Sequence, residues 1–369
     1  MRSAYVLLAT RMGSLHAFSQ IQPSAAVRNW LGGKRPSADT IARVVNRVNS
    51  DEIRSVIRDT FRTLKKNKGF QPLEGGDHVL LVFDGHESHA TYHRKCPGCL
   101  SRTIKTAAGE RVQHYHRYVA AHLVGRDFCF MVDMESLRGK DCEIAAARRL
   151  YQRIHASYSR AYDIVLGDAL YSCATFWTDV LKNNKHIITV LKDERRTLVS
   201  EARTLLRFVS PITESNKRHT REIRDLPENH GWSQLGRPVR IVQSNETKIV
   251  KRQLTGKDDA INSTWLWVTS IPPEEVNASN LVKIAHRRWS IENEGFNTLA
   301  NSWHADHVYR HDATAIDNFI LLTFLALNIF RVFLHRNIKP QRRARTATVR
   351  LAECIRAGVD ANTVWHDTS

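Results

Sequence analysis

The spacing of apolar and polar positions divides the chain into helical and strand-forming segments. Between residues 37 and 66, apolar residues recur three and four positions apart, which predicts two helices. A break and a helix cap are expected at Asn49 and Ser50. This helical pair is either a DNA-binding module or a plain helical hairpin, and the pattern favours neither.

Short, nearly continuous apolar runs follow, and such runs predict buried strands. We expect strands at 78–83, 118–124, 128–134, 163–167 and 187–192, with helices at 141–159 and 172–183. An order of three strands, helix, strand, helix, strand predicts an α/β domain with a mixed sheet covered by helices.

The region 208–272 breaks this order. Turn-rich polar segments separate β-like runs at 238–244, 248–254 and 264–271, so we predict a β-rich insertion. Helical periodicity returns at about 279–300 and about 314–336. The predicted segments are a helical N-terminal region (1–76), the α/β domain in two parts (77–207 and 273–337), the insertion (208–272) and a basic C-terminal tail (338–369).

The net charge of the chain indicates which class of molecule it binds. The 369 residues carry a formal net charge of +18, which indicates a polyanionic partner, most commonly nucleic acid, although a merely basic surface is the alternative. The tail after residue 331 contributes to this surplus. Its basic residues are Arg331, Arg336, Lys339, Arg342, Arg343, Arg345 and Arg350.

The number of cysteines and the length of the apolar runs indicate the cellular compartment in which the chain is expected. Six cysteines are too few for a disulfide scaffold, so a reduced, cytosolic chain is expected. The apolar run at 4–9 is shorter than a signal-peptide core, and the run at 319–330 is too short to span a bilayer. We therefore expect no membrane partner and a buried helix at 319–330.

Two aspartates share one sequence context. Asp84 and Asp168 each stand at the end of an expected apolar strand with a glycine adjacent, Gly85 after one and Gly167 before the other. Strand ends at one sheet edge are where α/β folds place their chemistry. A single Asp-Gly pair could merely start a turn, but two such positions favour a site.

Glu292 is a third candidate. On an α-helix, its neighbours three, four and seven positions away form a mainly apolar face, where an ionised carboxylate is costly unless it is paired or binds metal. Arg288, one turn earlier, could pair with it or clamp a DNA strand. Glu294 is expected to point elsewhere, toward solvent. Three carboxylates suit Mg²⁺ or Mn²⁺, and two such ions about 4 Å apart can activate an attacking water or 3′-hydroxyl.

The segments around these residues carry a family resemblance. Residues 83–106, 165–172 with 190–196, and 287–311 are similar to insertion-sequence DDE transposases of bacteria. The resemblance covers roughly residues 15 to 340 and implies a ribonuclease H-like catalytic domain with a β-rich insertion. It also implies that Asp84, Asp168 and Glu292 are the catalytic metal ligands, with two Mg²⁺ or Mn²⁺ ions.

The best-known signature of this group matches only in part. It consists of Tyr, two residues, Arg, three residues, Glu, six residues and Lys. Arg288 and Glu292 fit, but Ala285 and Leu299 stand at the Tyr and Lys positions. The match to this YREK-type group is therefore partly degenerate. The residues expected to contact DNA are Arg287, Arg288, Trp289, His304 and His307.

A Cys96-Pro-Gly-Cys99 motif has the spacing of a zinc knuckle. The chain has no second such motif, so we expect a turn with two free thiols. The alternative is a zinc site completed by nearby histidines, among them His86, His89, His93, His114 and His116. A second patch, His304, His307 and His311, has the spacing of one helix face.

The leading functional hypothesis is metal-dependent cleavage at transposon ends, followed by strand transfer into target DNA. The alternatives are a ribonuclease H-like nuclease without strand transfer and a catalytically inactive, transposase-derived DNA-binding protein. The expected partners are transposon-end DNA, target DNA and a second copy of the chain on DNA, and the expected location is the cytoplasm, associated with the nucleoid.

Overall fold

The computed structural model describes residues 1–33, 36–73, 78–107, 109–192, 196–252 and 256–359. The expected boundary at 76/77, part of the segment 190–196 and the last ten tail residues lie outside these ranges. The chain forms two compact units, described separately below. The first contains Met1–Asp77, Gly85–Ser159 and Ser290–Ser369, and the second His78–Asp84 and Arg160–Trp289.

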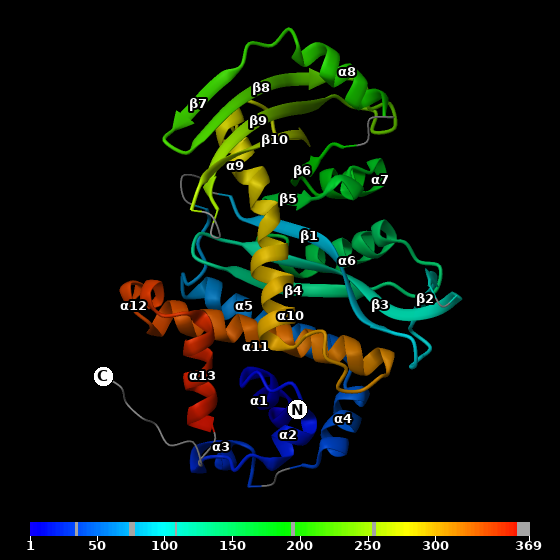
Figure 1. Ribbon diagram of the computed structural model, residues 1–369, viewed down its shortest axis with the longest axis vertical. Coiled ribbons are helices and arrows are strands. Elements are labelled where there is room, and N and C mark those ends of the chain that lie inside the picture. Colours follow the sequence, from blue (N-terminus) through cyan, green and yellow to red (C-terminus); the bar gives the residue numbers. More distant parts are fainter. Residues whose placement is uncertain (34–35, 74–77, 108, 193–195, 253–255, 360–369) are drawn as a thin grey trace. The chain divides into compact units, whose positions relative to one another are not determined.

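The second unit is built on three parallel strands (Figure 1). Strand β1 (Leu80–Thr91) enters this unit with its first five residues and pairs with β5 (Ile164–Gly167), which pairs with β6 (His186–Val190). The paired residues are almost entirely buried, as their apolar runs predict. The expectation that β1 ends before Asp84 was wrong, because the strand continues through Asp84 and Gly85 to Thr91.

The β-rich insertion is confirmed, and it continues the sheet of this unit. Four antiparallel strands follow β6 in the order β10-β9-β8-β7. They are β7 (Ile212–Asn216), β8 (His219–Asn229), β9 (Val239–Lys251) and β10 (Asp258–Thr269). The runs at 238–244 and 248–254 were predicted as separate strands, but the polar residues between them lie within the single strand β9.

Helices flank the sheet of the second unit. They are α7 (Ala174–Leu181), α8 (Thr197–Leu206) and α9 (Ala278–His286). Helix α8 packs on β8, and α9 packs on β8 and β9 (Figure 1). The single-turn 3-10 helices η1 (Ala169–Tyr171) and η2 (Arg287–Trp289) follow Asp168 and α9 respectively.

The first unit contains a second group of strands. Strand β3 (Gly109–Val124) pairs antiparallel with β2 (Leu100–Thr106) and with β4 (Cys129–Ser136). Helix α6 (Glu143–Tyr158) packs on β3 and β4. Apart from the extra strand β2, the chain order is β1, β3, β4, α6, β5, α7, β6. This order confirms the predicted mixed α/β, ribonuclease H-like fold.

Helix α11 (Ala313–Asn337) forms the core of the first unit and packs against β4 (Figure 1). It confirms the helix predicted at about 314–336, and with 25 residues and a mean hydropathy of 1.7 in its most apolar window it is long and apolar enough to cross a membrane, which the run at 319–330 alone did not indicate. However, 83% of its most apolar window is buried inside the protein, which confirms the predicted buried helix.

The N-terminal helices pack around α11. They are α1 (Arg2–Ala9), α2 (Leu15–Gln20), α3 (Ala25–Trp30), α4 (Ala38–Arg47) and α5 (Ser50–Lys66). Helices α1, α4 and α5 contact α11 directly. The buried Asn318 of α11 donates to the carbonyls of Val45 and Val48 and accepts from Ser50 Oγ. The two predicted helices and the Asn49 cap are confirmed, and they are integrated into the core of this unit.

The basic segment after residue 338 was predicted as a tail, but it forms α12 (Pro340–Arg345) and α13 (Thr348–Val359). Helix α13 buries Leu351 and Ala352. Arg331 does not belong to a solvated basic face either, because it donates to the carbonyls of Cys129 and Glu294.

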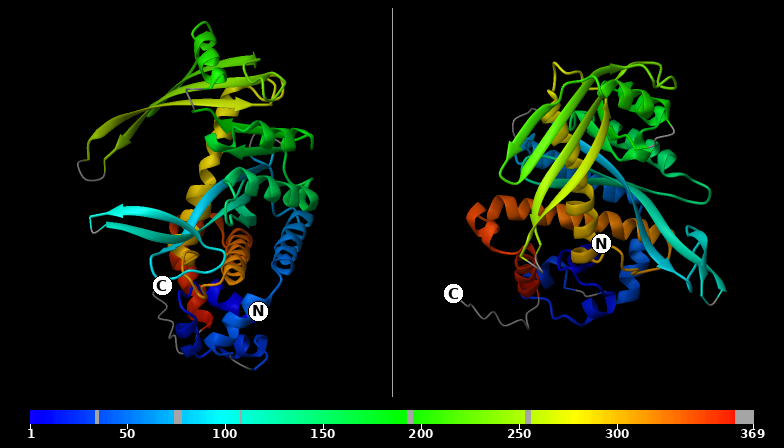
Figure 2. Two further views of the ribbon diagram at one scale, coloured as in Figure 1. Left: turned by 90° about the vertical axis from the view of Figure 1, so that its right-hand side faces the viewer. Right: turned by 45° about the horizontal axis from the view of Figure 1, so that its top comes forward.

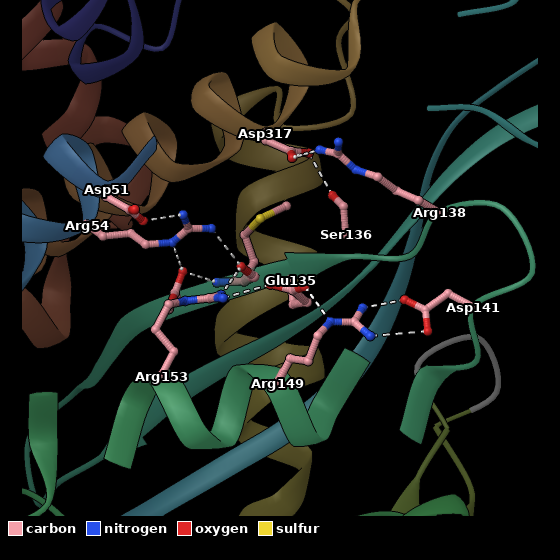
Figure 3. Close-up of polar contacts among 11 residues, drawn as sticks. Asp51, Arg54, Glu135, Ser136, Arg138, Asp141, Arg149, Arg153 and Asp317 are labelled. Atoms are coloured by element: carbon pink, nitrogen blue, oxygen red, sulfur yellow. Dashed lines mark hydrogen bonds and ion pairs between the residues drawn. The ribbon is translucent and has the colours of Figure 1, made fainter. Parts of the chain in front are cut away.

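An ion-pair network joins four elements of the first unit (Figure 3). The buried Asp133 of β4 accepts hydrogen bonds from Arg54 Nε of α5 at 2.8 Å and from Arg153 Nε of α6 at 2.6 Å. Nearby, Arg138 and Ser136 donate to Asp317 of α11. These pairs fix α5, α6 and α11 against β4.

Candidate active site

Asp84 and Asp168 lie at the same edge of the parallel strand pair in the second unit. The last paired residues in the register of β1 and β5 are Val82 and Leu166. Each aspartate stands two residues beyond its paired residue. Both are partly exposed, whereas the residues before them are buried. The register places both aspartates just beyond the pairing of β1 with β5, Asp168 directly after β5 and Asp84 within β1.

The backbone around Asp168 fixes its carboxylate. Asp168 Oδ1 accepts a hydrogen bond from the backbone N–H of Leu170 at 2.8 Å and so caps η1. Gly167 leaves no room for a side chain, because an added Cβ would lie 2.6 Å from Tyr171 Cβ. Tyr171 is fully buried, so it is a core residue, as is Trp177.

Glu292 lies in the first unit, in a segment that is not the α-helix expected from sequence. Residues Ile291–Phe296 form a π-helix, which leads into α10 (Asn297–Trp303). The face inferred from α-helical spacing was therefore wrong. Glu292 is partly exposed, while Ile291 and Phe296 are buried. Glu294, expected to be solvated, accepts from Cys129 Sγ at 3.1 Å. Single π turns in helices occur frequently at functional sites.

Within the first unit, the π-helix packs against the strand that continues from Asp84. His86 stacks on Phe296 with ring centroids 4.6 Å apart, and the two rings are nearly parallel. His86 Nε2 also contacts Asp306 Oδ1 at 3.1 Å. The π-helix contacts β3 and β4 as well. Glu292 is thus carried by a segment with extensive packing on its unit's strands.

The sequence Arg287-Arg288-Trp289 ends the second unit. Arg288 is only 4% exposed, and its guanidinium lies 4.2 Å from the centroid of the Trp289 ring. Arg287 and Trp289 are partly exposed. Arg288 is therefore placed to support Trp289 by a cation–π contact, whereas Arg287 and Trp289 present surface to a ligand.

The degenerate signature positions are core positions. Ala285 and Leu299 are each 1% exposed. His286 donates to Glu246 Oε1 at 2.7 Å, so it is part of a buried carboxylate cluster.

The histidines of the second patch, His304, His307 and His311, do not lie together on one helix. Helix α10 ends at Trp303, and His304 adopts a left-handed conformation with φ 52°. The three histidines therefore do not share a helix face, contrary to the spacing argument. His304 and His307 are exposed, but His311 Nε2 lies 3.3 Å from Cys99 Sγ.

The Cys96-Pro-Gly-Cys99 motif has histidine neighbours. The ligating atoms of Cys96, Cys99, His116 and His311 all lie within 4.8 Å of one another. Of the histidines considered from sequence, His116 joins the cluster. Burial first, and then the neighbouring His89 and His311, lower the pKa of His116 to about 4, so its imidazole is neutral near pH 7. The expectation of two free thiols in an isolated turn was incomplete.

Sequence patterns did not reveal a basic pocket formed by the insertion together with residues 190–192 and 203–207. The pocket has a volume of about 730 Å³ and lies within the second unit. Its cationic and aromatic lining residues include Lys192, Arg203, Arg207, Arg224 and Trp265. These residues come from four separate segments, so only the folded sheet brings them together. Such a lining suits a phosphate backbone with an aromatic ring available for stacking.

Comparison with known proteins identifies the class of this chain. The transposase DDE domain family matches residues 75–329, and the chain belongs to that family. Its fold and family define a transposase-type enzyme that acts on DNA, and members of the family typically use divalent metal ions. A comparison with curated proteins found no match.

Proposed function

We propose that this protein is a bacterial insertion-sequence transposase that cuts DNA at transposon ends and joins those ends to target DNA. Asp84, Asp168 and Glu292 are the proposed catalytic residues. The protein would act as a homodimer on DNA, in the cytoplasm and associated with the nucleoid. The observation that carries the proposal is the alignment of Asp84 and Asp168 at one strand edge of a chain in the transposase DDE family.

The residues fit a divalent cation of the Mg²⁺ or Mn²⁺ type. Carboxylate oxygens are the ligands these hard cations prefer, and partly exposed carboxylates leave room for the waters that Mg²⁺ retains. Two bound ions would activate the attacking oxygen and stabilise the leaving oxygen. Asp168, held by the Leu170 N–H, would keep one carboxylate oxygen in a fixed direction. Glu292, in the π-helix, would supply the third carboxylate ligand.

DNA contacts are proposed for Arg287, Arg288, Trp289, His304 and His307. Arg288 would act through the Trp289 ring that it supports. The basic pocket lined by Lys192 and Trp265 adds a second surface, formed by the insertion and the residues before it. The net charge of +18 supports many phosphate contacts, so affinity for DNA should fall steeply with rising salt concentration.

The experiment uses the full-length protein and DNA that flanks its own gene. With Mg²⁺, the protein should cut at the element ends and leave a scrambled DNA of equal length intact. Ends that are already cut and carry a 3′-hydroxyl should then be joined to a target plasmid. Cleavage without joining would indicate a nuclease without strand transfer. Tight binding with neither reaction would indicate an inactive DNA-binding derivative, and both results contradict the proposal.

A further inference from the structure

Four candidate metal ligands from three distant segments meet within the first unit. Cys96 and Cys99 lie in the loop before β2, His116 lies in β3, and His311 immediately precedes the N-cap of α11. Their ligating atoms lie within 4.8 Å of one another. The two sulfurs are 3.6 Å apart, and His116 Nε2 lies 3.4 Å from Cys96 Sγ and 3.3 Å from Cys99 Sγ.

These distances match a tetrahedral zinc site. With Zn–S bonds of about 2.3 Å and Zn–N bonds of about 2.0 Å, a tetrahedron separates two sulfurs by about 3.8 Å and a sulfur from a nitrogen by about 3.5 Å. The separation of 3.6 Å between the sulfurs is far longer than a disulfide bond. Cys99 Sγ lies 3.6 Å from Cys96 Sγ and 3.3 Å from both His116 Nε2 and His311 Nε2, as expected for ligands that share one ion.

The loop is shaped to present both sulfurs. The backbone N–H of Cys99 donates to the carbonyl of Cys96 at 3.0 Å, and the N–H of Cys96 donates to Cys99 Sγ at 3.2 Å. An N–H donor to sulfur stabilises a thiolate ligand from outside the metal's own shell. Gly98 packs so closely on α11 that an added Cβ would lie 2.6 Å from Ala313 Cβ. The motif is therefore built against the start of that helix.

We propose that Cys96, Cys99, His116 and His311 bind one zinc ion with a structural role. Four protein ligands leave no open position, which is the arrangement of structural rather than catalytic zinc. The site contains none of the proposed catalytic carboxylates. Zinc would join the loop before β2, strand β3 and the start of α11.

The joined segments support an exposed basic hairpin formed by β2 and the first part of β3 (Figure 2). The hairpin carries the exposed Arg102, Lys105 and Arg111. Arg102 also stacks on Tyr115 at 4.6 Å from its ring centroid. Zinc at the base of this hairpin would hold it in one orientation relative to α11.

Metal analysis and X-ray absorption of the purified full-length protein test the site directly. About one zinc per chain is expected, with two sulfur and two nitrogen ligands at about 2.3 Å and 2.0 Å. A natively folded protein without zinc after growth in zinc-supplemented medium would overturn the proposal. Zinc bound only through oxygen and nitrogen would do so as well, because it would indicate adventitious binding elsewhere.

Variants locate the ion. Cys99→Ser and His311→Gln should lose zinc, whereas Cys142→Ser, at an exposed cysteine, should keep it. Asp84→Asn should also keep it, which separates this site from the proposed catalytic one. If the ligand variants do not fold, Co²⁺ added to chelator-treated wild-type protein should give thiolate-to-cobalt charge-transfer absorption. Absence of that absorption, or full zinc content in Cys99→Ser, would refute the assignment.

Discussion

Asp84 and Asp168 each stand two residues beyond Val82 and Leu166, the last paired residues in the register of strands β1 and β5. Parallel pairing places both carboxylates at one edge, although 84 positions separate the two aspartates in the sequence. The side chain of Asp168 also caps η1 through the Leu170 N–H. One residue thus combines a structural and a proposed catalytic role, and substitutions can separate them.

Asp168→Asn should unfold at nearly the wild-type temperature but fail to cleave DNA, because the amide oxygen can still accept from Leu170 while the ligand charge is lost. Asp168→Ala should also fail to cleave and should lose about 1 kcal/mol of stability with the cap. Thermal unfolding and end cleavage of both variants check this. Equal stability of the two variants would show that the cap contributes nothing.

Gly167→Ala should impair both folding and cleavage. The added methyl would meet the rigid, buried Tyr171 at 2.6 Å, so the backbone that carries Asp168 must shift. Overpacking of this kind costs about 1–3 kcal/mol. Gly358→Ala, where an added Cβ meets nothing within 4 Å, is the matched control and should be neutral or stabilising. Wild-type activity and stability in Gly167→Ala would contradict the constraint.

Asp133→Asn tests the ion-pair network of the first unit. Asp133 is buried and receives bonds from Arg54 and Arg153, which are themselves partly exposed. Loss of its charge should lower the free energy of unfolding by about 2–3 kcal/mol, somewhat less than for a fully buried pair. Asp259→Asn, in an exposed pair with Arg252, should change it by less than about 1 kcal/mol. Urea denaturation of both variants gives the comparison.

Glu246 should contribute to acid stability. Burial raises the pKa of this carboxyl, but hydrogen bonds from His286 and Ser244 and the charges of His286 and Arg221 outweigh burial and lower the pKa to about 2. A lowered folded-state pKa stabilises the protein above the ordinary value of 4.5, and the stabilisation is lost as pH falls toward about 2. Stability in Glu246→Gln should therefore depend less on pH between about 4.5 and about 2. If the free energy of unfolding of Glu246→Gln depends on pH as that of the wild type does, Glu246 does not contribute to acid stability.

The buried strands and helices could be predicted from sequence because their apolar residues form continuous or periodic runs. Strands β2 and β7 could not, because their side chains are largely exposed and give no apolar signal. The polar stretch within β9 was taken for a break because its residues give no apolar signal, although Glu246 among them is buried. Helices α12 and α13 were missed because their many arginines resemble a solvated tail.

The candidate site was predictable only where the residues followed buried strands. Asp168 met that condition, and Asp84 follows the buried part of β1, whereas Glu292 was inferred from an apolar α-helical face and from the family resemblance. The π-helix around Glu292 could not be predicted, since apolar spacing assumes α-helical geometry. The contact of Cys99 with His311 joins residues 212 positions apart, so local sequence could not indicate it. The same holds for the basic pocket, which is assembled from separate strands and helices.

The most direct test of the central claim is end cleavage by Asp84→Asn, Asp168→Asn and Glu292→Gln, measured beside DNA binding. Each should bind DNA as the wild type does but cleave about a thousandfold more slowly, because lost metal charge stabilisation of about 4 kcal/mol slows the reaction by that factor. The control is Asp163→Asn at the opposite end of β5, where the carboxylate accepts from the Val79 N–H. It should cleave normally. Normal cleavage by any of the three variants, or an equal loss in the control, would contradict the assignment of the site.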